Sequence, residues 1–272
     1  MTQMRSLLLL ALVGCAPALS SFQPAHVGKK GTVSVELGAD VSVPTGTIGK
    51  VVDAGEALSD AAADRELTDE ERDQVIEAGA TLALAPPGFN QHVGGYYVPK
   101  TGWEIGLRYQ GGGWRVGMRH QILKQEDNGI DLTVGIGAAR FAFEFPIDNV
   151  FDILTLEDFT RYTVDIPVQV GQHGDFYRWW IAPRLVFDSY GTSLKFTQPT
   201  TSEVTLASID GKSAFVGGQA GLAVGYRKIF IAAELTMARL ISTAHMSVLD
   251  EKRDFDIGGL IVYPGLAIMG EL

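Results

Sequence analysis

Apolar and polar side chains alternate with a period of two residues in one segment of this chain after another. In residues 31–43, valines, Leu37 and Ala39 occupy every second position, and serine, glutamate, glycine and aspartate lie between them. A period of two places successive side chains on opposite faces of a β-strand, so each segment predicts a strand with one apolar and one polar face. The pattern recurs in nine further segments, namely 88–98, two segments within 101–120, 129–138, 161–170, 177–188, 213–226, 229–238 and 256–269. The chain is therefore predicted to be all-β.

The connections between these strands alternate in length. The short ones are 99–101, 124–128, 172–176 and 227–228, and the long ones are 44–87, 146–160, 189–212 and 243–255. Only the short turn at 111–112 breaks this order. Short turns at one end and long loops at the other are typical of up-and-down antiparallel barrels that cross a membrane. We expect such a transmembrane β-barrel over residues 31–272, with about ten strands and eight as the alternative.

The polar faces of the predicted strands do not have the composition of a surface in water. They are rich in glycine, arginine and acids, whereas the lysines concentrate in turns and tails. A soluble sheet would carry Lys, Glu, Ser and Thr on its exposed face. We therefore expect the polar faces to line a narrow lumen, where arginines bridge carboxylates. The expected lumen-lining charges are Glu36, Asp40, Glu104, Arg108, Arg115, Arg119, Asp131, Arg161, Asp165, Arg178, Arg184 and Glu234, with Asp188 beside them.

Aromatic residues on the apolar faces are sorted toward the strand ends. In the ten-strand topology, one group falls at the end with short turns and the other at the end with long loops. Amphipathic rings gather at the two boundaries between water and lipid, and a soluble core has no reason to sort them this way. The predicted aromatic girdle consists of Trp103, Tyr177, Trp179 and Tyr226 at the first end and Tyr109, Trp114, Tyr162 and Phe187 at the second.

On these patterns, residues 31–270 resemble the small outer-membrane β-barrel proteins of Gram-negative bacteria. The resemblance implies a location in the outer membrane, contact with its lipid and insertion by the barrel-assembly machinery. Two features depart from it. The chain ends in AIMGEL, whereas such barrels usually end in an aromatic residue, and Pro167, Pro183 and Pro264 lie within predicted strands, where each removes one ladder hydrogen bond.

The first residues have the form of an export signal. Arg5 precedes an apolar run over 7–13, which is too short to cross a bilayer. The sequence from Leu12 to Cys15 resembles a bacterial lipobox, which implies a signal peptide over 1–14, lipidation of Cys15 and a periplasmic tether over 15–30. The alternative is ordinary cleavage after Ala18, at an A-x-A site.

An acidic insertion separates the first two strands. Residues 44–87 contain ten acidic and three basic residues and so account for most of the net charge of −10. Thr68 and Glu71 form a capping box, which predicts a helical insertion in the first extracellular loop. A calcium loop over 60–71 is disfavoured because Arg65 stands where such a loop needs glycine. The insertion is a candidate contact for an extracellular partner, and the acidic chain is not expected to bind nucleic acid.

No motif in the sequence carries catalytic chemistry. The five histidines lack metal-ligand spacing, and no nucleophile elbow, Walker loop or dinucleotide fingerprint is present. A pairing of His245 with Ser242 or Ser247 near the rim is the only catalytic arrangement to consider. We expect no enzyme, cofactor or metal, and predict a structural or narrow-pore barrel lipoprotein in the outer membrane. The alternative is a soluble periplasmic lipoprotein with a β-sandwich or lipocalin-like fold that binds an apolar ligand.

Overall fold

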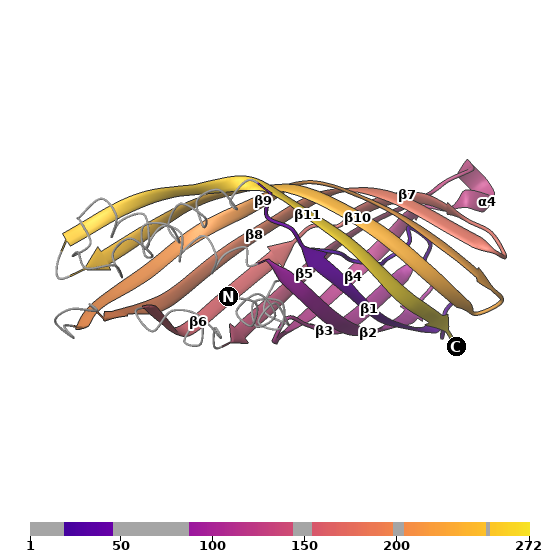
Figure 1. Ribbon diagram of the computed structural model, residues 1–272. Coiled ribbons are helices and arrows are strands. Elements are labelled where there is room, and N and C mark those ends of the chain that lie inside the picture. Colours follow the sequence, from indigo (N-terminus) through magenta and orange to yellow (C-terminus); the bar gives the residue numbers. More distant parts are fainter. Residues whose placement is uncertain (1–18, 46–86, 144–153, 198–203, 249–250) are drawn as a thin grey trace.

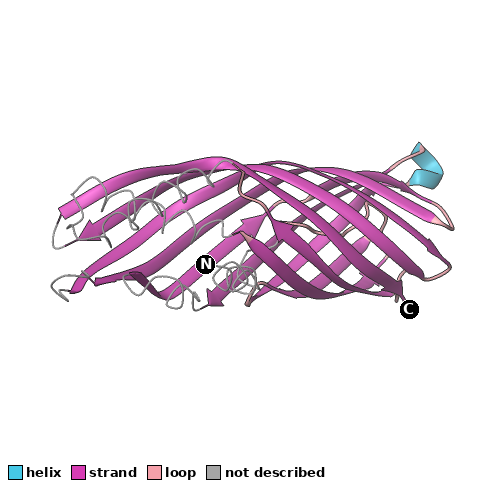
Figure 2. Cartoon of the chain, in the orientation of Figure 1, coloured by secondary structure: helices cyan, strands magenta, loops and turns pink. Residues whose placement is uncertain are grey.

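The computed structural model describes residues 19–45, 87–143, 154–197, 204–248 and 251–272, and nearly all of this is β-strand (Figures 1 and 2). The elements are β1 (Val33–Ser42), β2 (Gly88–Lys100), β3 (Trp103–Gln110), β4 (Gly113–Leu123), α4 (Gln125–Asn128), β5 (Asp131–Phe143), β6 (Leu154–Asp165), β7 (Val168–His173), β8 (Tyr177–Thr197), β9 (Val204–Tyr226), β10 (Ile229–Val248) and β11 (Glu251–Glu271). Within the described residues, no helix has the length and hydrophobicity needed to cross a membrane.

The strands close into an antiparallel barrel. Strands that follow one another in sequence are paired, apart from β6 and β7, and β1 also pairs with β11, which joins the first strand to the last. β6 and β7 share one position between β5 and β8, so the closed sheet has ten strand positions. The predicted ten-strand barrel is confirmed, and the eight-strand alternative is wrong. The predicted helical insertion lies outside the described residues.

The three prolines that argued against a barrel are accommodated in two ways. Pro167 lies in the break between β6 and β7, where the chain would otherwise run as one strand. Pro183 and Pro264 remain inside β8 and β11, opposite Gly218 and Leu235. Because each proline removes only one hydrogen bond from a long ladder, the closed sheet tolerates both.

The two ends of the barrel differ in their connections. At one end, which we call the turn end, lie the short connections after β2, β4, β7 and β9 and the C-terminus. The opposite end, the loop end, carries the connections after β1, β5, β8 and β10 and the tight turn at Gly111 and Gly112. Both glycines have positive φ, as the type I′ turn between two twisted strands requires.

Strand lengths divide the barrel further. β8 to β11 have 20 to 23 residues each, whereas β1 to β5 have 8 to 13. The long strands project past the short ones at the loop end (left side of Figure 1). We call the part between the two aromatic groups the wall, and the projecting part of β8 to β11 the extension.

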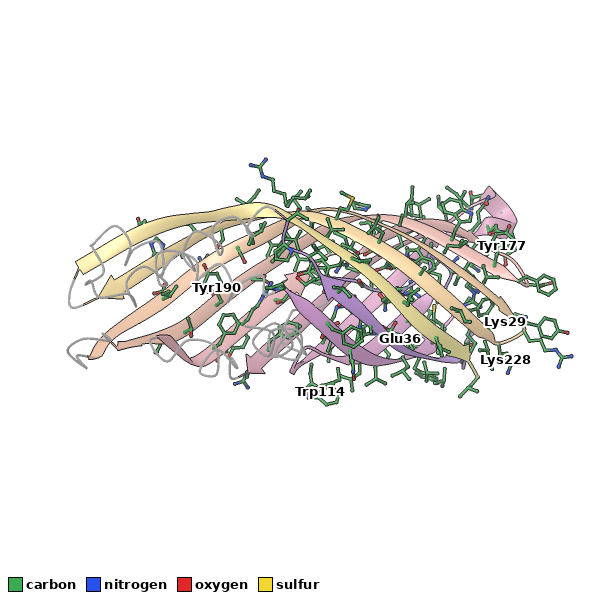
Figure 3. All side chains as sticks on the ribbon, viewed as in Figure 1. Lys29, Glu36, Trp114, Tyr177, Tyr190 and Lys228 are labelled. Carbon is green, nitrogen blue, oxygen red and sulfur yellow. The ribbon has the colours of Figure 1, made fainter. Side chains whose placement is uncertain are left out.

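Burial alternates along the wall, with charged and polar residues and a cluster of apolar residues inside, and large apolar residues outside. β2 shows a strict alternation of buried and exposed positions from Gly88 to Pro99. Large apolar side chains on the outer face are strongly exposed. Leu37, Ile231 and Leu266 each expose more than 60% of their surface. Charged residues on the opposite face, such as Glu36, are buried (Figure 3).

The segment before β1 lies inside the barrel. Every residue from Leu19 to Ala25, and also Val27, is buried, and Phe22 is only 1% exposed. We call residues 19–27 the plug. The prediction of a tether outside the barrel is therefore wrong for these residues, because the lumen contains the polar groups that their backbone needs.

Candidate functional site

The lumen and its plug form the candidate functional site. All twelve charged residues that the sequence assigns to the lumen lie on the inner face of the barrel, eleven of them buried and Arg115 largely so. Asp188 joins them. They come from seven different strands, so the closure of the sheet brings them together.

Two arginines make paired contacts with carboxylates of the same or a nearby strand pair on the inner face. Arg115 donates from Nε and Nη2 to the two carboxylate oxygens of Asp165, at 2.9 and 2.8 Å. Arg119 donates likewise to Glu104, at 2.7 and 3.2 Å. The planar guanidinium matches both carboxylate oxygens at once, which gives these pairs a fixed geometry.

The remaining arginines also lie beside carboxylates. Arg108 Nε is 3.0 Å from Glu36, and Arg184 is 3.6 Å from Asp165. Arg161 pairs with Asp188, and its guanidinium lies over the ring of Phe215. Arg178 pairs with Glu271 and lies over the ring of Phe230. Glu271 was not among the predicted residues, because the pattern gave no reason to place the last acidic residue inside the barrel.

Close packing leaves little free space between these groups. The inner cavities beside Arg115 and Arg178 each offer about 20 Å³ to water, enough for a single molecule. Gly106 makes the packing possible at one point, since a Cβ there would lie 2.3 Å from the ring of Tyr96. Around these two arginines, little of the interior is therefore open to water.

Glu234 on β10 fixes the middle of the plug. Its carboxylate accepts hydrogen bonds from the backbone N–H groups of Ser21 and Phe22, at 2.7 and 3.0 Å. Trp180 donates its indole N–H to the same carboxylate at 2.8 Å. The hydrogen bonds that satisfy this buried carboxylate therefore come largely from the plug itself.

Other lumen residues satisfy the rest of the plug backbone. Arg108 donates to the carbonyl oxygen of Ser20 at 2.6 Å, and Arg119 donates to that of Pro24. Gln219 donates to the Ser21 hydroxyl at 2.7 Å. In addition, Gln121 accepts from the backbone N–H of Val27, and the ring of Phe22 stacks on His92. The same arginines therefore bind both the acids of the wall and the carbonyl groups of the plug.

At the turn end, the plug meets the wall in a cluster of three side chains. His173 Nδ1 lies 2.7 Å from Asp131 Oδ2, and His26 Nδ1 lies 3.9 Å from the same oxygen. The two imidazole rings stack, with centroids 3.8 Å apart. Burial, and then the neighbouring His173, lower the pKa of His26 to about 4, so its ring is neutral at neutral pH. Sequence spacing could not reveal this cluster, because its members come from the plug, β5 and β7.

The aromatic residues assigned to the girdle lie on the outer face. Seven of the eight are exposed and Trp179 is partly exposed. Tyr109, Trp114 and Tyr162 follow one another across the sheet, with Arg140 of β5 between the last two. At the turn end, Trp103 stacks on His120, and Tyr226 stacks on Phe176, a ring that the sequence pattern did not single out.

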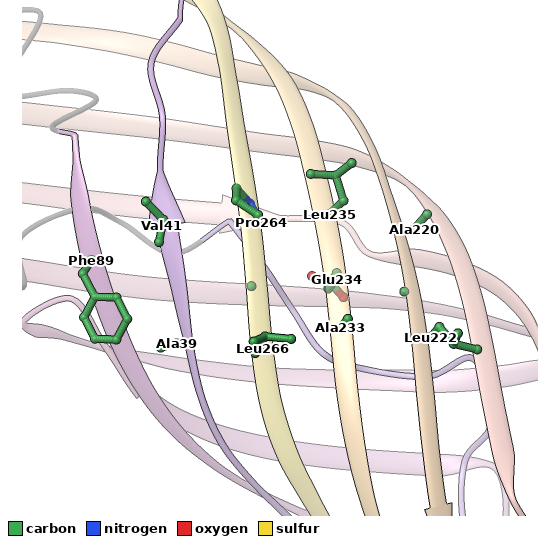
Figure 4. A pocket seen from close by; sticks show the side chains of 12 residues that line it. Ala39, Val41, Phe89, Ala220, Leu222, Ala233, Glu234, Leu235, Pro264 and Leu266 are labelled. Carbon is green, nitrogen blue, oxygen red and sulfur yellow. The ribbon is translucent and has the colours of Figure 1, made fainter.

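A shallow hollow of about 690 Å³ lies on the outer face over β1, β2, β9, β10 and β11 (Figure 4). Small side chains such as Ala220 and Ala233 form part of its lining, and larger ones such as Leu222 and Leu266 stand beside them. Glu234 lies behind this surface, with its carboxylate toward the plug. The hollow is apolar and belongs to the outer face of the wall.

Of the two pairings considered near the rim, the one between His245 and Ser242 is not formed. His245 is exposed and its Nδ1 lies 2.7 Å from Asp254, whereas Ser242 is buried on the opposite face of β10. The Ser242 hydroxyl contacts the Tyr190 hydroxyl at 2.9 Å and donates to the backbone carbonyl of Lys212. Ser242 and His245 therefore cannot act together as a nucleophile and base.

No protein-family model matches the chain, and no curated protein matches it. Among solved structures, it is similar to a major outer membrane protein from Thermus thermophilus, with 9% identity, a TM-score of 0.35, and coverage of 88% of this chain and 99% of the other. It is also similar to Ail, the attachment invasion locus protein of Yersinia pestis, with 12% identity, a TM-score of 0.29, and coverage of 90% and 100%. A third similar structure is the N-terminal β-barrel domain of Pseudomonas aeruginosa OprF, with 9% identity, a TM-score of 0.27, and coverage of 90% and 100%.

Proposed function

We propose that this protein is a non-catalytic barrel of the bacterial outer membrane whose lumen is closed by its own N-terminal plug. The membrane location is supported by the wall, whose apolar face points outward and is bordered by aromatic side chains. In water, so large an apolar exterior would drive aggregation. A soluble lipocalin-like protein would instead bury its apolar face and keep space inside for an apolar ligand.

The single observation that supports a closed rather than a conducting barrel is the position of residues 19–27 in the lumen, where all but His26 are buried. The plug is bound along its length by Glu234, Arg108, Arg119 and Gln121. An arginine-lined anion pathway needs guanidinium groups that face open water, and here they are engaged with carboxylates and with plug carbonyl groups. We therefore favour a structural role in the membrane over a narrow pore.

Conductance of the purified protein in a planar lipid bilayer tests this proposal. The intact protein should give no steady ion current. A matched sample of the protein without residues 19–27, refolded from urea into detergent, should conduct, because its lumen then contains only the side chains of the wall. Steady single-channel currents from the intact protein would overturn the proposed closure.

The direction of the plug bears on how the N-terminus is processed. Leu19 lines a cavity with Phe141 and Arg161, near the level of the loop-end turn, whereas Val27 lies near the turn end, beside Gln121. Cys15 precedes Leu19 by only four positions, which is at most about 14 Å of extended chain. A lipid on Cys15 therefore cannot reach the periplasmic leaflet while the plug is in place.

Of the two processing routes, we accordingly propose cleavage after Ala18 in place of lipidation at Cys15. The new α-amino group at Leu19 would enter a lumen that already holds the buried carboxylate of Asp40. Intact-mass measurement on the mature protein should give the mass of residues 19–272. A mass that corresponds to a diacylated chain from residue 15 would contradict this route and restore the lipoprotein.

Contact of the acidic segment 44–87 with an extracellular partner, and insertion by the barrel-assembly machinery, remain parts of the proposal. The composition of the segment supports the partner, because its ten acidic residues outnumber its three basic ones. The barrel fold itself supports insertion by the barrel-assembly machinery.

A further inference from the structure

The cluster of His26, Asp131 and His173 has the composition of a transition-metal site. One potential ligand atom from each residue lies within 4.8 Å of the other two. Two imidazole nitrogens and one carboxylate oxygen suit Zn²⁺ and its neighbours in the first transition row, whereas Ca²⁺ and Mg²⁺ prefer oxygen alone. The three residues come from segments more than 40 positions apart, so only the closed barrel with the plug inside it forms the cluster.

The distances from Asp131 to the two histidines are close to those of a zinc site, and the stacked imidazole rings would turn apart to direct one nitrogen each at the ion. Ligand atoms about 2.0–2.2 Å from a tetrahedral zinc lie about 3.3–3.6 Å from one another. Asp131 Oδ2 lies 2.7 Å from His173 Nδ1 and 3.9 Å from His26 Nδ1, one contact slightly shorter than this range and the other slightly longer. His26 Nδ1 is buried and has no hydrogen-bond partner within the described part of the chain. A metal ion would supply the partner that this nitrogen lacks.

The neighbouring groups hold the ligands in position. Asp131 Oδ1 accepts hydrogen bonds from the Gln121 side chain and the Gln125 backbone, at 2.6 and 2.9 Å, which leaves Oδ2 directed at the two histidines. The Gln125 side chain also binds both the backbone N–H and the carbonyl oxygen of His173. Such outer contacts fix ligand geometry in established metal sites. The positive charge of the nearby Arg178 is matched by Glu271.

We propose that His26, Asp131 and His173 bind one Zn²⁺ ion at the turn end of the barrel. The two imidazoles are 22% and 23% exposed, so water from the periplasmic side can complete the coordination. Because His26 belongs to the plug and the other ligands to the wall, the ion joins the two. This consequence, that zinc fastens the plug, rests on the proposed function, whereas the binding of zinc itself does not.

Zinc binding is measured by titration calorimetry on the untagged protein in detergent, after removal of metal with a chelator. The intact protein should bind one zinc ion per chain. The variants His26→Gln and His173→Gln should each bind it at least about tenfold more weakly. His120→Gln is the matched control, since His120 lies at the same end but stacks on Trp103 on the outer face. The zinc affinity of this variant should equal that of the intact protein.

A second readout identifies the coordination. Cobalt in place of zinc should give the strong visible absorption of a tetrahedral site in the intact protein and in His120→Gln, and should lose it in His26→Gln. Failure of the intact protein to bind zinc more tightly than the His26→Gln variant would overturn the site, even if the bilayer shows no current. Zinc binding together with a steady current would support the site and would contradict the closed barrel instead.

Discussion

The wall and the extension share the strands β9 and β10, and the same alternation of side chains runs through both, yet their outward faces differ in polarity. In the wall, the outward residues of β9 are apolar, as at Leu222 and Val216, and the inward face of the barrel carries the charges. In the extension, the outward residues are Ser208, Asp210 and Lys212, whereas Ile209 is buried. The change occurs on β9 between Val216 and Lys212.

The same reversal appears on the neighbouring strands. On β10, Ala244 is buried in the extension, and Thr243 and His245 point outward. On β8, the outward residues change from Phe187 to Ser189. An alternating sequence fixes only that a strand has two different faces, and the medium outside decides which of them is apolar. The reversal therefore locates the outer boundary of the apolar medium, close to the row of Tyr109, Trp114 and Tyr162.

The largest difference between the regions is expected for carboxylates that form ion pairs. Asp165→Ala in the wall leaves Arg115 and Arg184 without their partner in a buried lumen, which should lower the free energy of unfolding by about 3–5 kcal/mol. Asp254→Ala removes the partner of the exposed His245 in the extension and should leave stability unchanged. Urea unfolding in detergent, followed by tryptophan fluorescence, measures both. Equal effects would show that the ion pair in the lumen is no costlier to break than the exposed one.

A positive charge introduced on the outer face should lower stability in the wall and leave it unchanged in the extension. Leu222 lies about 10 Å along the barrel axis from Tyr226, near the middle of an apolar band about 25 Å tall. Leu222→Arg should destabilise the barrel by about 2–4 kcal/mol when it is folded into lipid vesicles. Ser208→Arg, on the same face of the same strand but in the extension, should have no effect. Comparable stability of the two variants would contradict the boundary between them.

The smallest of the three effects concerns the contact between wall and plug. Glu234→Ala removes the acceptor for Ser21, Phe22 and Trp180 and should cost about 1–3 kcal/mol. It should also release the plug and allow ion current. Thr236→Ala is the control on the same strand, since the Thr236 hydroxyl forms no hydrogen bond within the described chain. A silent bilayer with the Glu234 variant would mean that other contacts suffice to hold the plug.

The sequence predicts the wall well, because its side chains repeat a local pattern. The period of two places Glu104 and Arg108 on one face of β3 and Trp103 and Tyr109 on the other, whatever the neighbouring strands are. The strand count could be predicted for the same reason. Pro167 could be recognised as a defect, although not as the break between β6 and β7, since that depends on how both pieces pair with β8.

The plug and the histidine cluster could not be predicted in this way. Residues 19–27 have no periodicity and are assigned by sequence to a periplasmic tether, because their burial depends on acceptors and donors from distant strands. The sequence places Glu234 in the lumen but cannot identify its role in binding the plug. Its partners there include backbone N–H groups, which every residue except proline has. His26, Asp131 and His173 likewise become neighbours only after the sheet has closed around the plug.

The central claim is that the outer face of the wall lies in lipid, and spin labels on single cysteines test it most directly. Leu222→Cys and Ser208→Cys are each made in a Cys15→Ala background, labelled and folded into vesicles. We expect the label at residue 222 to be accessible to oxygen and shielded from a water-soluble paramagnetic reagent, and the label at 208 to show the reverse. Access of the water-soluble reagent to residue 222 would contradict the claim, because that position would then face water.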